Sequence, residues 1–257
     1  MHGEEMKRKH NLITLVGTAI ALVIAMQINV AAQQLLLNEV EIDAPSDLSN
    51  ACQYTEVRGT PGAVVPANTY FLSVNSDGAN FGFTNQVVNF GGQTVGANGT
   101  IVLFNNSALA CPNRTYGAGT TFFQYFSALV VGRGSETYLI VRSTTPIAPG
   151  SDLDVNDDGV FDNTTITVLD GFGLIVNPEE EFVYGAEAGV VNISNLTTVD
   201  QPDAVTRFPN NTTPFAAGAF YFGELAASPD ETTQYVAPLS PNFPAGGMLT
   251  PGAPNVS

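Results

Sequence analysis

Residues 35–42 read Leu-Leu-Leu-Asn-Glu-Val-Glu-Ile, a pattern that commits this part of the chain to a β-sheet. Val40 and Ile42 alternate with Glu39 and Glu41. Successive side chains of a strand point to opposite faces, so this alternation predicts a strand with one packed face and one face in water. We therefore expect Glu39 and Glu41 to be exposed.

Short segments of the same kind follow along the chain, separated by glycine, proline, asparagine and aspartate. Helical periodicity is nearly absent after residue 32, and this pattern is typical of an all-β sandwich or barrel. Tyr138-Leu139-Ile140-Val141 is apolar on both faces, which indicates a central strand. The expected strands are Leu35–Ile42, Tyr54–Arg58, Thr69–Val74, Gln86–Phe90, Thr100–Phe104, Thr137–Arg142, Thr165–Val176, Phe182–Tyr184, Ala204–Phe208 and Ala219–Leu225.

Two further segments leave alternatives open. Thr121–Leu129 is rich in aromatic residues and fits either a short helix or a buried strand. The tail Pro238–Ser257 is rich in proline, glycine and asparagine. It fits either an extended strap over the sheet or a disordered end.

Residues 1–32 have the pattern of a signal peptide. Lys7-Arg8-Lys9 form a basic region, Leu12 to Ile28 an apolar stretch, and Val30-Ala31-Ala32 a cleavage signal. We expect residues 1–32 to form a short leader helix that is removed by cleavage after Ala32. The product would then be secreted or held at the cell surface. An uncleaved membrane anchor is the alternative, although the apolar run is near the lower limit for a span.

Residues 33–257 are long enough to bury a full core and suit one large all-β domain. A boundary near Pro146–Ser151 is a weaker alternative. From Gln33 onward five arginines face 22 acids, a net charge near −17. Because such a field repels nucleic acids and anionic lipid, we expect neither nucleic acid nor membrane as a partner after cleavage.

The part after the leader lacks the side chains on which most enzymes depend. Every histidine and lysine lies at or before residue 10, and tryptophan is absent. The part after the leader therefore cannot use an imidazole as a general base or a lysine amine to form a Schiff base. Cys52 and Cys111 are the only cysteines, and in an exported chain we expect them to form a structural disulfide.

The sequence Asp154-Val-Asn-Asp-Asp-Gly-Val-Phe-Asp162 has the spacing of a calcium loop, with Gly159 at its sharp turn. Phe161 is expected to point to the core. Thr165 stands where a bidentate glutamate usually completes such a loop, so we expect weak affinity, on the order of 10⁻⁴–10⁻³ M. A plain polar turn is the alternative. The expected ligands are the side chains of Asp154, Asn156, Asp158 and Asp162 and the carbonyl of Val160.

Paired carboxylates are the one catalytic chemistry that we weigh, because glycosidases need only two of them. Glu179-Glu180-Glu181 fits a solvated turn, and tryptophan, a common platform for sugars, is absent. We therefore assign no catalytic residue and expect no enzyme, with a carboxylate-dependent extracellular hydrolase as the alternative. The available acids are Glu39, Glu41, Glu56, Asp170, Glu179–Glu181 and Glu224.

Short motifs along the chain resemble bacterial secreted proteins with lamin-tail-like domains. Leu37–Asp43 followed by Tyr54–Gly59 resembles the opening strand pair of that family. Leu249–Asn255 resembles its terminal Thr-Pro-Gly-Ala-x-Asn motif. Asp152–Asp162 and Pro202–Pro209 are similar to a longer bacterial subgroup. The resemblance implies an immunoglobulin-like β-sandwich with elaborated loops.

Within that family such domains are non-catalytic parts of exported nucleases and surface proteins. Resemblance and composition together predict a secreted non-catalytic binding or surface-structural module, with calcium as a structural cofactor. Its partner would be an extracellular protein or glycan. A cell-surface assembly component is a third class, which an exposed apolar patch or an unprotected edge strand would favour.

Overall fold

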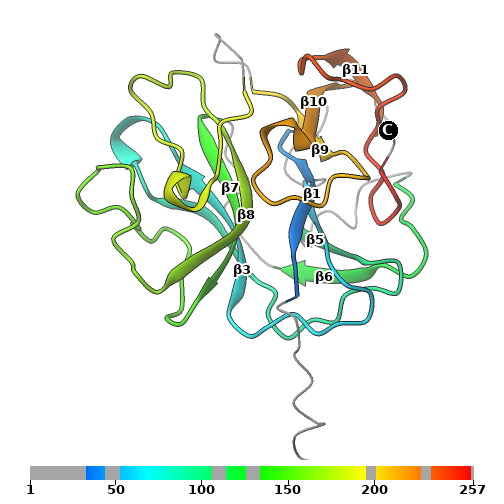
Figure 1. The fold of residues 1–257 in the computed structure, drawn as a ribbon, viewed down its shortest axis with the longest axis horizontal. Coiled ribbons are helices and arrows are strands. Elements are labelled where there is room, and N and C mark those ends of the chain that lie inside the picture. Colours follow the sequence, from blue (N-terminus) through cyan, green and yellow to red (C-terminus); the bar gives the residue numbers. More distant parts are fainter. Residues whose placement is uncertain are drawn as a thin grey trace, which may run out of the picture. The chain divides into compact units, whose positions relative to one another are not determined.

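Two β-sheets account for most of the regular structure (Figure 1). The structure is a computed structural model that describes residues 33–43, 53–105, 114–125, 134–194, 201–226 and 233–255. The leader, Cys52 and Cys111 lie outside these ranges, so the signal peptide and the disulfide stay predictions. Within the ranges, no helix has the length and apolar character needed to cross a bilayer. The fold class is all-β, as predicted.

The larger sheet has seven strands, with β1 at its centre. Neighbouring strands of this sheet pair antiparallel, except that β5 and β6 pair parallel. In spatial order its strands are β11 (Tyr235–Pro238), β10 (Phe220–Leu225), β9 (Ala204–Arg207), β1 (Leu36–Glu41), β2 (Tyr54–Arg58), β5 (Thr100–Asn105) and β6 (Thr121–Tyr125).

The smaller sheet has four antiparallel strands. The short 3₁₀ turns η2 (Gly78–Asn80), η4 (Ala186–Ala188) and η5 (Ala217–Ala219) lie in the connections. The central position predicted for the apolar segment at 138–141 is confirmed. In spatial order the strands are β4 (Thr84–Asn89), β3 (Thr69–Asn75), β7 (Glu136–Ser143) and β8 (Ile166–Leu174).

Nine of the ten expected strands form, and Thr121–Tyr125 resolves as a strand. The strand expected at Phe182–Tyr184 is wrong. This segment is a loop whose aromatic rings pack on the outer face of the four-stranded sheet, so its apolar character reflects burial rather than sheet pairing. Strand β11 has no counterpart among the expected strands.

Apolar side chains are buried in three layers. The central layer lies between the sheets and includes Leu37, Val40, Phe71 and Ile140. A second layer covers the outer face of the four-stranded sheet, and a third covers the outer face of the seven-stranded sheet. Each sheet is therefore buried on both faces along much of its length.

The exposure expected for Glu39 and Glu41 is wrong, because these side chains are 1% and 0% exposed. Strand β1 carries a bulge, in which Leu37 pairs with Val57 and Glu39 pairs with Glu56. Asn38 is the extra residue, so Leu37 and Val40 both face the central layer, whereas Asn38 and Glu39 both face outward. The outward face is buried because the C-terminal segment covers it.

Replacing Phe71 with alanine should lower the free energy of unfolding by about 3–5 kcal/mol, because its fully buried ring leaves a cavity between the sheets. Urea denaturation measures the change. Val64→Ala is the control, since Val64 is 61% exposed and its loss should stay within about 0.5 kcal/mol. Equal effects of the two substitutions would contradict the assignment of the central core.

Candidate functional site

The outward face of the seven-stranded sheet holds three buried carboxylates, those of Glu39, Glu41 and Glu56. Glu39 and Glu56 lie opposite each other in neighbouring strands. Such carboxylates are costly to bury unless donors surround them. Several of the donors come from the C-terminal segment, residues 239–255, which we call the strap.

The strap binds Glu39 and Glu56 mainly through its backbone. The Thr250 N–H donates to Oε1 of Glu39 at 2.8 Å, and the Thr250 hydroxyl donates to the same oxygen at 3.0 Å. The Gly252 N–H donates to Oε2 of Glu56. From the sheet side, the Tyr54 hydroxyl donates to Glu39 at 2.5 Å and the Asn38 amide donates to Glu56 at 2.5 Å.

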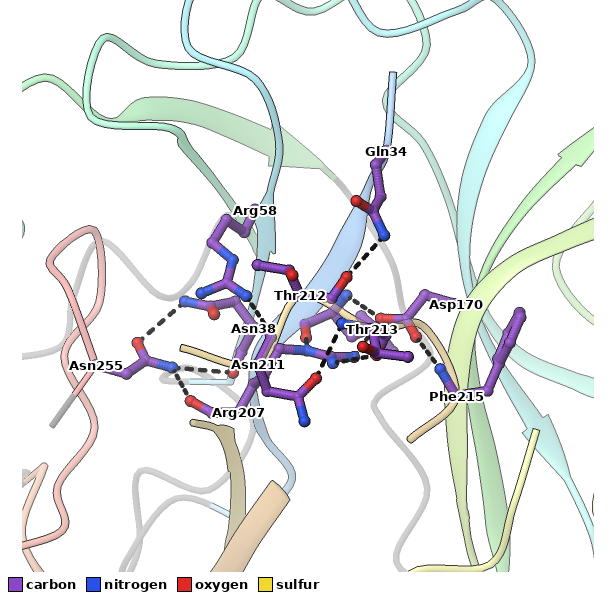
Figure 2. Close-up of polar contacts among 11 residues, drawn as sticks. Gln34, Asn38, Arg58, Asp170, Arg207, Asn211, Thr212, Thr213, Phe215 and Asn255 are labelled. Carbon is purple, nitrogen blue, oxygen red and sulfur yellow. Dashed lines mark hydrogen bonds and ion pairs between the residues drawn. The ribbon is translucent and has the colours of Figure 1, made fainter. Parts of the chain in front are cut away.

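Asn255 fastens the end of the strap. Its side-chain amide donates to the backbone carbonyl of Arg207 at 2.7 Å, and its side-chain oxygen accepts a hydrogen bond from Asn38 at 3.0 Å. In Figure 2, Asn255 lies to one side of these two residues and contacts both. The strap predicted as one alternative for the tail is therefore confirmed for residues 239–255.

Gly252 allows the strap to turn at this point. Its φ of +72° suits glycine, and a Cβ there would lie 2.3 Å from the Thr120 hydroxyl. The Ala253 N–H donates to the Thr250 carbonyl at 2.7 Å, which closes a β-turn through Pro251 and Gly252. This turn aims the Gly252 N–H at Glu56.

Glu41 is neutralised separately. Arg114 donates to both of its carboxylate oxygens, at 2.9 and 2.7 Å, and both side chains are fully buried. The Arg114 guanidinium also lies 4.7 Å from the centre of the Tyr54 ring. A buried pair of this kind fixes the position of the segment that carries Arg114 against β1.

Burial raises the pKa values of all three carboxyls from the ordinary 4.5. The pKa of Glu39 rises to about 7, although hydrogen bonds from Tyr54 and Thr250 oppose the shift. The pKa of Glu41 also rises to about 7, with Arg114 opposing. Burial and the neighbouring charge of Glu39 raise the pKa of Glu56 well above its usual range.

A second buried charge pair joins the two sheets (Figure 2). Arg207 of β9 forms an ion pair with Asp170 of β8, and both side chains are fully buried. Arg207 also donates to the Leu37 carbonyl at 2.6 Å, while Asp170 accepts from the Leu37 N–H at 2.8 Å. Asp170 therefore lies between the sheets, away from the carboxylates under the strap.

The loop at 208–216 is held against this pair. Asp170 accepts from the Phe215 N–H at 3.0 Å, and Arg207 donates to the Thr213 carbonyl at 3.1 Å. Arg58 donates to the carbonyls of Pro209 and Asn211. Phe215 has a φ of +59°, a strained value for an aromatic residue that these contacts hold in place.

The predicted calcium loop is organised around Asp154, which is fully buried. Its carboxylate accepts from the N–H groups of Asp158 and Gly159 at 3.1 and 2.8 Å and from the Tyr184 hydroxyl at 3.0 Å. Phe161 is buried, as expected, and stacks on Tyr184 with ring centres 5.2 Å apart.

The remaining predicted ligands lie on the exposed side of this loop. Asn156 donates to Asp158 at 2.9 Å, and Asp162 accepts from the Val155 N–H at 2.8 Å. Val160 is 48% exposed, and its N–H donates to Asp158 at 3.0 Å. Among the described residues no three acidic, histidine or cysteine side chains gather as a metal site. Calcium binding stays a prediction.

The other candidate acids do not join these groups. Glu179 and Glu180 are exposed in a turn, as expected, while Glu181 accepts from the Ser135 hydroxyl at 2.6 Å. Glu224 lies on β10 and is partly buried. Glu136, which the sequence did not single out, is buried beside Ser73 and Asn85, and burial raises its pKa to about 8.

Sequence reasoning missed the residues that complete both buried networks. Thr250 and Asn255 lie more than 200 positions from their partners in β1, and Arg207 lies 37 positions from Asp170. Local periodicity carries no signal for such pairs. The Thr-Pro-Gly-Ala motif at 250–253 contains turn-forming residues, which is the one local signal that this part of the tail adopts a defined conformation.

Comparisons with family models, with curated proteins and with solved structures found no match.

The raised pKa values predict that the chain is more stable in mild acid. Between about pH 4.5 and 7 the folded chain binds more protons at Glu39 and Glu41 than the unfolded chain, so the free energy of unfolding falls as pH rises through this window. Thermal unfolding should give a Tm several degrees higher at pH 5 than at pH 7.5.

Glu39→Gln should flatten part of this dependence, because the amide cannot ionise. Glu187→Gln is the matched control, since Glu187 is exposed. A pH dependence of Tm in Glu39→Gln equal to that of the unsubstituted chain would refute the assignment.

Proposed function

We propose that this chain is a secreted or cell-surface, non-catalytic binding or surface-structural module, built as an elaborated immunoglobulin-like β-sandwich of the lamin-tail type. The carrying observation is that Glu39 and Glu56 serve as acceptors for the strap. Among the candidate acids in the described residues, Glu39 and Glu56 are the pair that face each other across neighbouring strands. Both are engaged in holding the strap on the sheet.

The motifs behind the family resemblance support the same proposal. Asn38 and Glu39 belong to the opening motif, and Thr250 and Asn255 belong to the terminal motif. Although 211 to 217 positions separate them, they are joined by hydrogen bonds. Two motifs that form one structural unit are a stronger argument for common ancestry than two unrelated matches.

A hydrolase that used Glu39 and Glu56 as its catalytic pair would need a different arrangement. A retaining or inverting pair must reach a sugar ring from two sides with water at hand. Glu39 and Glu56 are buried beneath the strap. Neither lines the surface cavity beside Arg142 or the one beside Asp152. The raised pKa of Glu39 has a sufficient cause in burial, without a catalytic role.

The proposal is tested by incubating the full-length chain with a panel of extracellular polysaccharides and proteins while retention and product release are both measured. We expect retention of at least one polymer without release of reducing ends. Product formation that Glu56→Gln abolishes and Glu187→Gln preserves would establish the hydrolase instead.

We further propose that calcium stabilises the loop at 154–162. The folded loop already presents Asn156, Asp158 and Asp162 at the surface around the buried Asp154, and oxygen ligands of this kind suit calcium. Binding would tie the loop to the aromatic stack of Phe161 and Tyr184.

Millimolar calcium should raise the Tm of the chain by a few degrees, because a ligand that binds only the folded state stabilises it. Asp158→Ala should remove this response, whereas Glu187→Ala should keep it. Thermal scans with and without calcium measure the difference, and an unchanged Tm in the unsubstituted chain at millimolar calcium would end the proposal.

A further inference from the structure

A cavity of about 380 Å³ opens at one end of the four-stranded sheet. Its size lies in the range of small-molecule sites. It is formed where β3 begins, β7 ends and β8 begins, since β7 runs antiparallel to both neighbours. Its polar lining consists mainly of hydroxyl and amide groups, and its apolar part includes Leu169. The residues used below are Asn68, Arg142, Thr144, Thr165, Thr167 and Leu169.

Arg142 is the only cation that lines this cavity. Tyr138 and Ile140 of the same strand face the central layer, so alternation places Arg142 on that face, just beyond the end of the apolar core. Arg142 is exposed, and within the described residues no hydrogen bond or ion pair engages its side chain. None of the residues that line the cavity is acidic.

The other described arginines are all occupied. Arg58 binds backbone carbonyls, Arg114 binds Glu41, and Arg207 binds Asp170. Arg142 differs from them in offering its guanidinium to solvent within a concave surface. In a chain with a net charge of −16, an open guanidinium away from acidic partners is a distinct site for an anion.

The hydroxyl groups beside Arg142 are held in fixed positions. The Thr165 hydroxyl lies 2.7 Å from that of Thr145 and 3.0 Å from that of Ser143, and it donates to the Asn163 side chain at 2.7 Å. The Ser143 N–H donates to the Asn68 carbonyl at 3.1 Å. Because these contacts order the wall before a ligand arrives, binding costs less conformational entropy.

We propose that this cavity binds a single uronic-acid residue of an otherwise neutral polysaccharide, with the sugar carboxylate on Arg142. A guanidinium matches a carboxylate through two parallel hydrogen bonds. Thr144, Thr167 and Asn68 complement ring hydroxyls, and Leu169 offers an apolar surface to the C–H face of the ring. One cation in a strongly acidic chain selects a singly charged sugar over a polyanion.

This inference rests on the proposed function, because it names the ligand class of the binding module. The test is a calorimetric titration of the full-length chain with a disaccharide of one glucuronate and one neutral hexose. The comparison ligands are the matching all-neutral disaccharide, tri-galacturonate and N-acetylglutamate amide. We expect the glucuronate disaccharide to bind at least about tenfold more tightly than each of the others.

Arg142→Gln should weaken that binding at least about tenfold, in keeping with the loss of a charged hydrogen-bonded pair. Gln124→Glu changes the net charge by the same amount at an exposed position of β6 and should leave affinity unchanged. Thr167→Val keeps a β-branched side chain in β8 and should weaken binding severalfold. It is the replacement test variant if Arg142→Gln lowers the Tm.

The possible failures are distinguishable. If the glucuronate disaccharide binds equally to Arg142→Gln, the cavity assignment is overturned while a binding module stands. Equal affinity for N-acetylglutamate amide or tri-galacturonate would overturn the choice of a uronate-bearing sugar. If none of these ligands binds but the polymer panel yields a partner, this inference fails alone; if the panel also yields nothing, both proposals fail.

Discussion

Desolvation of Glu39 and Glu56 is the constraint on which the seven-stranded sheet depends. The two carboxylates face each other on a sheet surface that is closed to water, so each must find donors within the protein. The strap supplies them through the N–H groups of Thr250 and Gly252. Because backbone N–H groups have fixed positions, this demand determines where the strap lies and where it turns. The bulge at Asn38 serves the same purpose, since it turns two polar side chains toward Glu56 and the strap.

The pair of Asp170 and Arg207 solves the corresponding problem between the sheets. A buried ion pair gains stability only when further hydrogen bonds satisfy both partners. Here Leu37 of β1 supplies both an N–H and a carbonyl, so one backbone residue binds the acid and the base together. The same pair orders the loop at 208–216 and imposes the left-handed conformation of Phe215. Strand β1 is thus the place where both buried networks and both sheets meet.

Most strands could be predicted from the sequence because each depends on a local alternation that the chain displays directly. The contacts of the strap, the bulge and the two buried networks could not. Alternation predicted that Glu39 and Glu41 face water, and the error arose because periodicity shows which residues share a face but not what covers it. Asn255 and Arg207 meet β1 over separations of 217 and 170 positions, which no local pattern encodes. The loop around Asp154 could be predicted in position but not in its hydrogen bonding, because its spacing suits both a cation and a turn.

This topology also orders the events of folding. Strand β1 precedes its partner β9 and the strap by a long stretch of sequence, so the seven-stranded sheet cannot be completed before those distant segments have formed. Closing such long loops adds only modestly to the entropy cost of folding, because that cost grows with the logarithm of length. The large sequence separation of these contacts affects the folding rate more than the stability, since chains dominated by such contacts fold slowly. Until the strap arrives, Glu39 and Glu56 remain hydrated and a wide apolar face stays open.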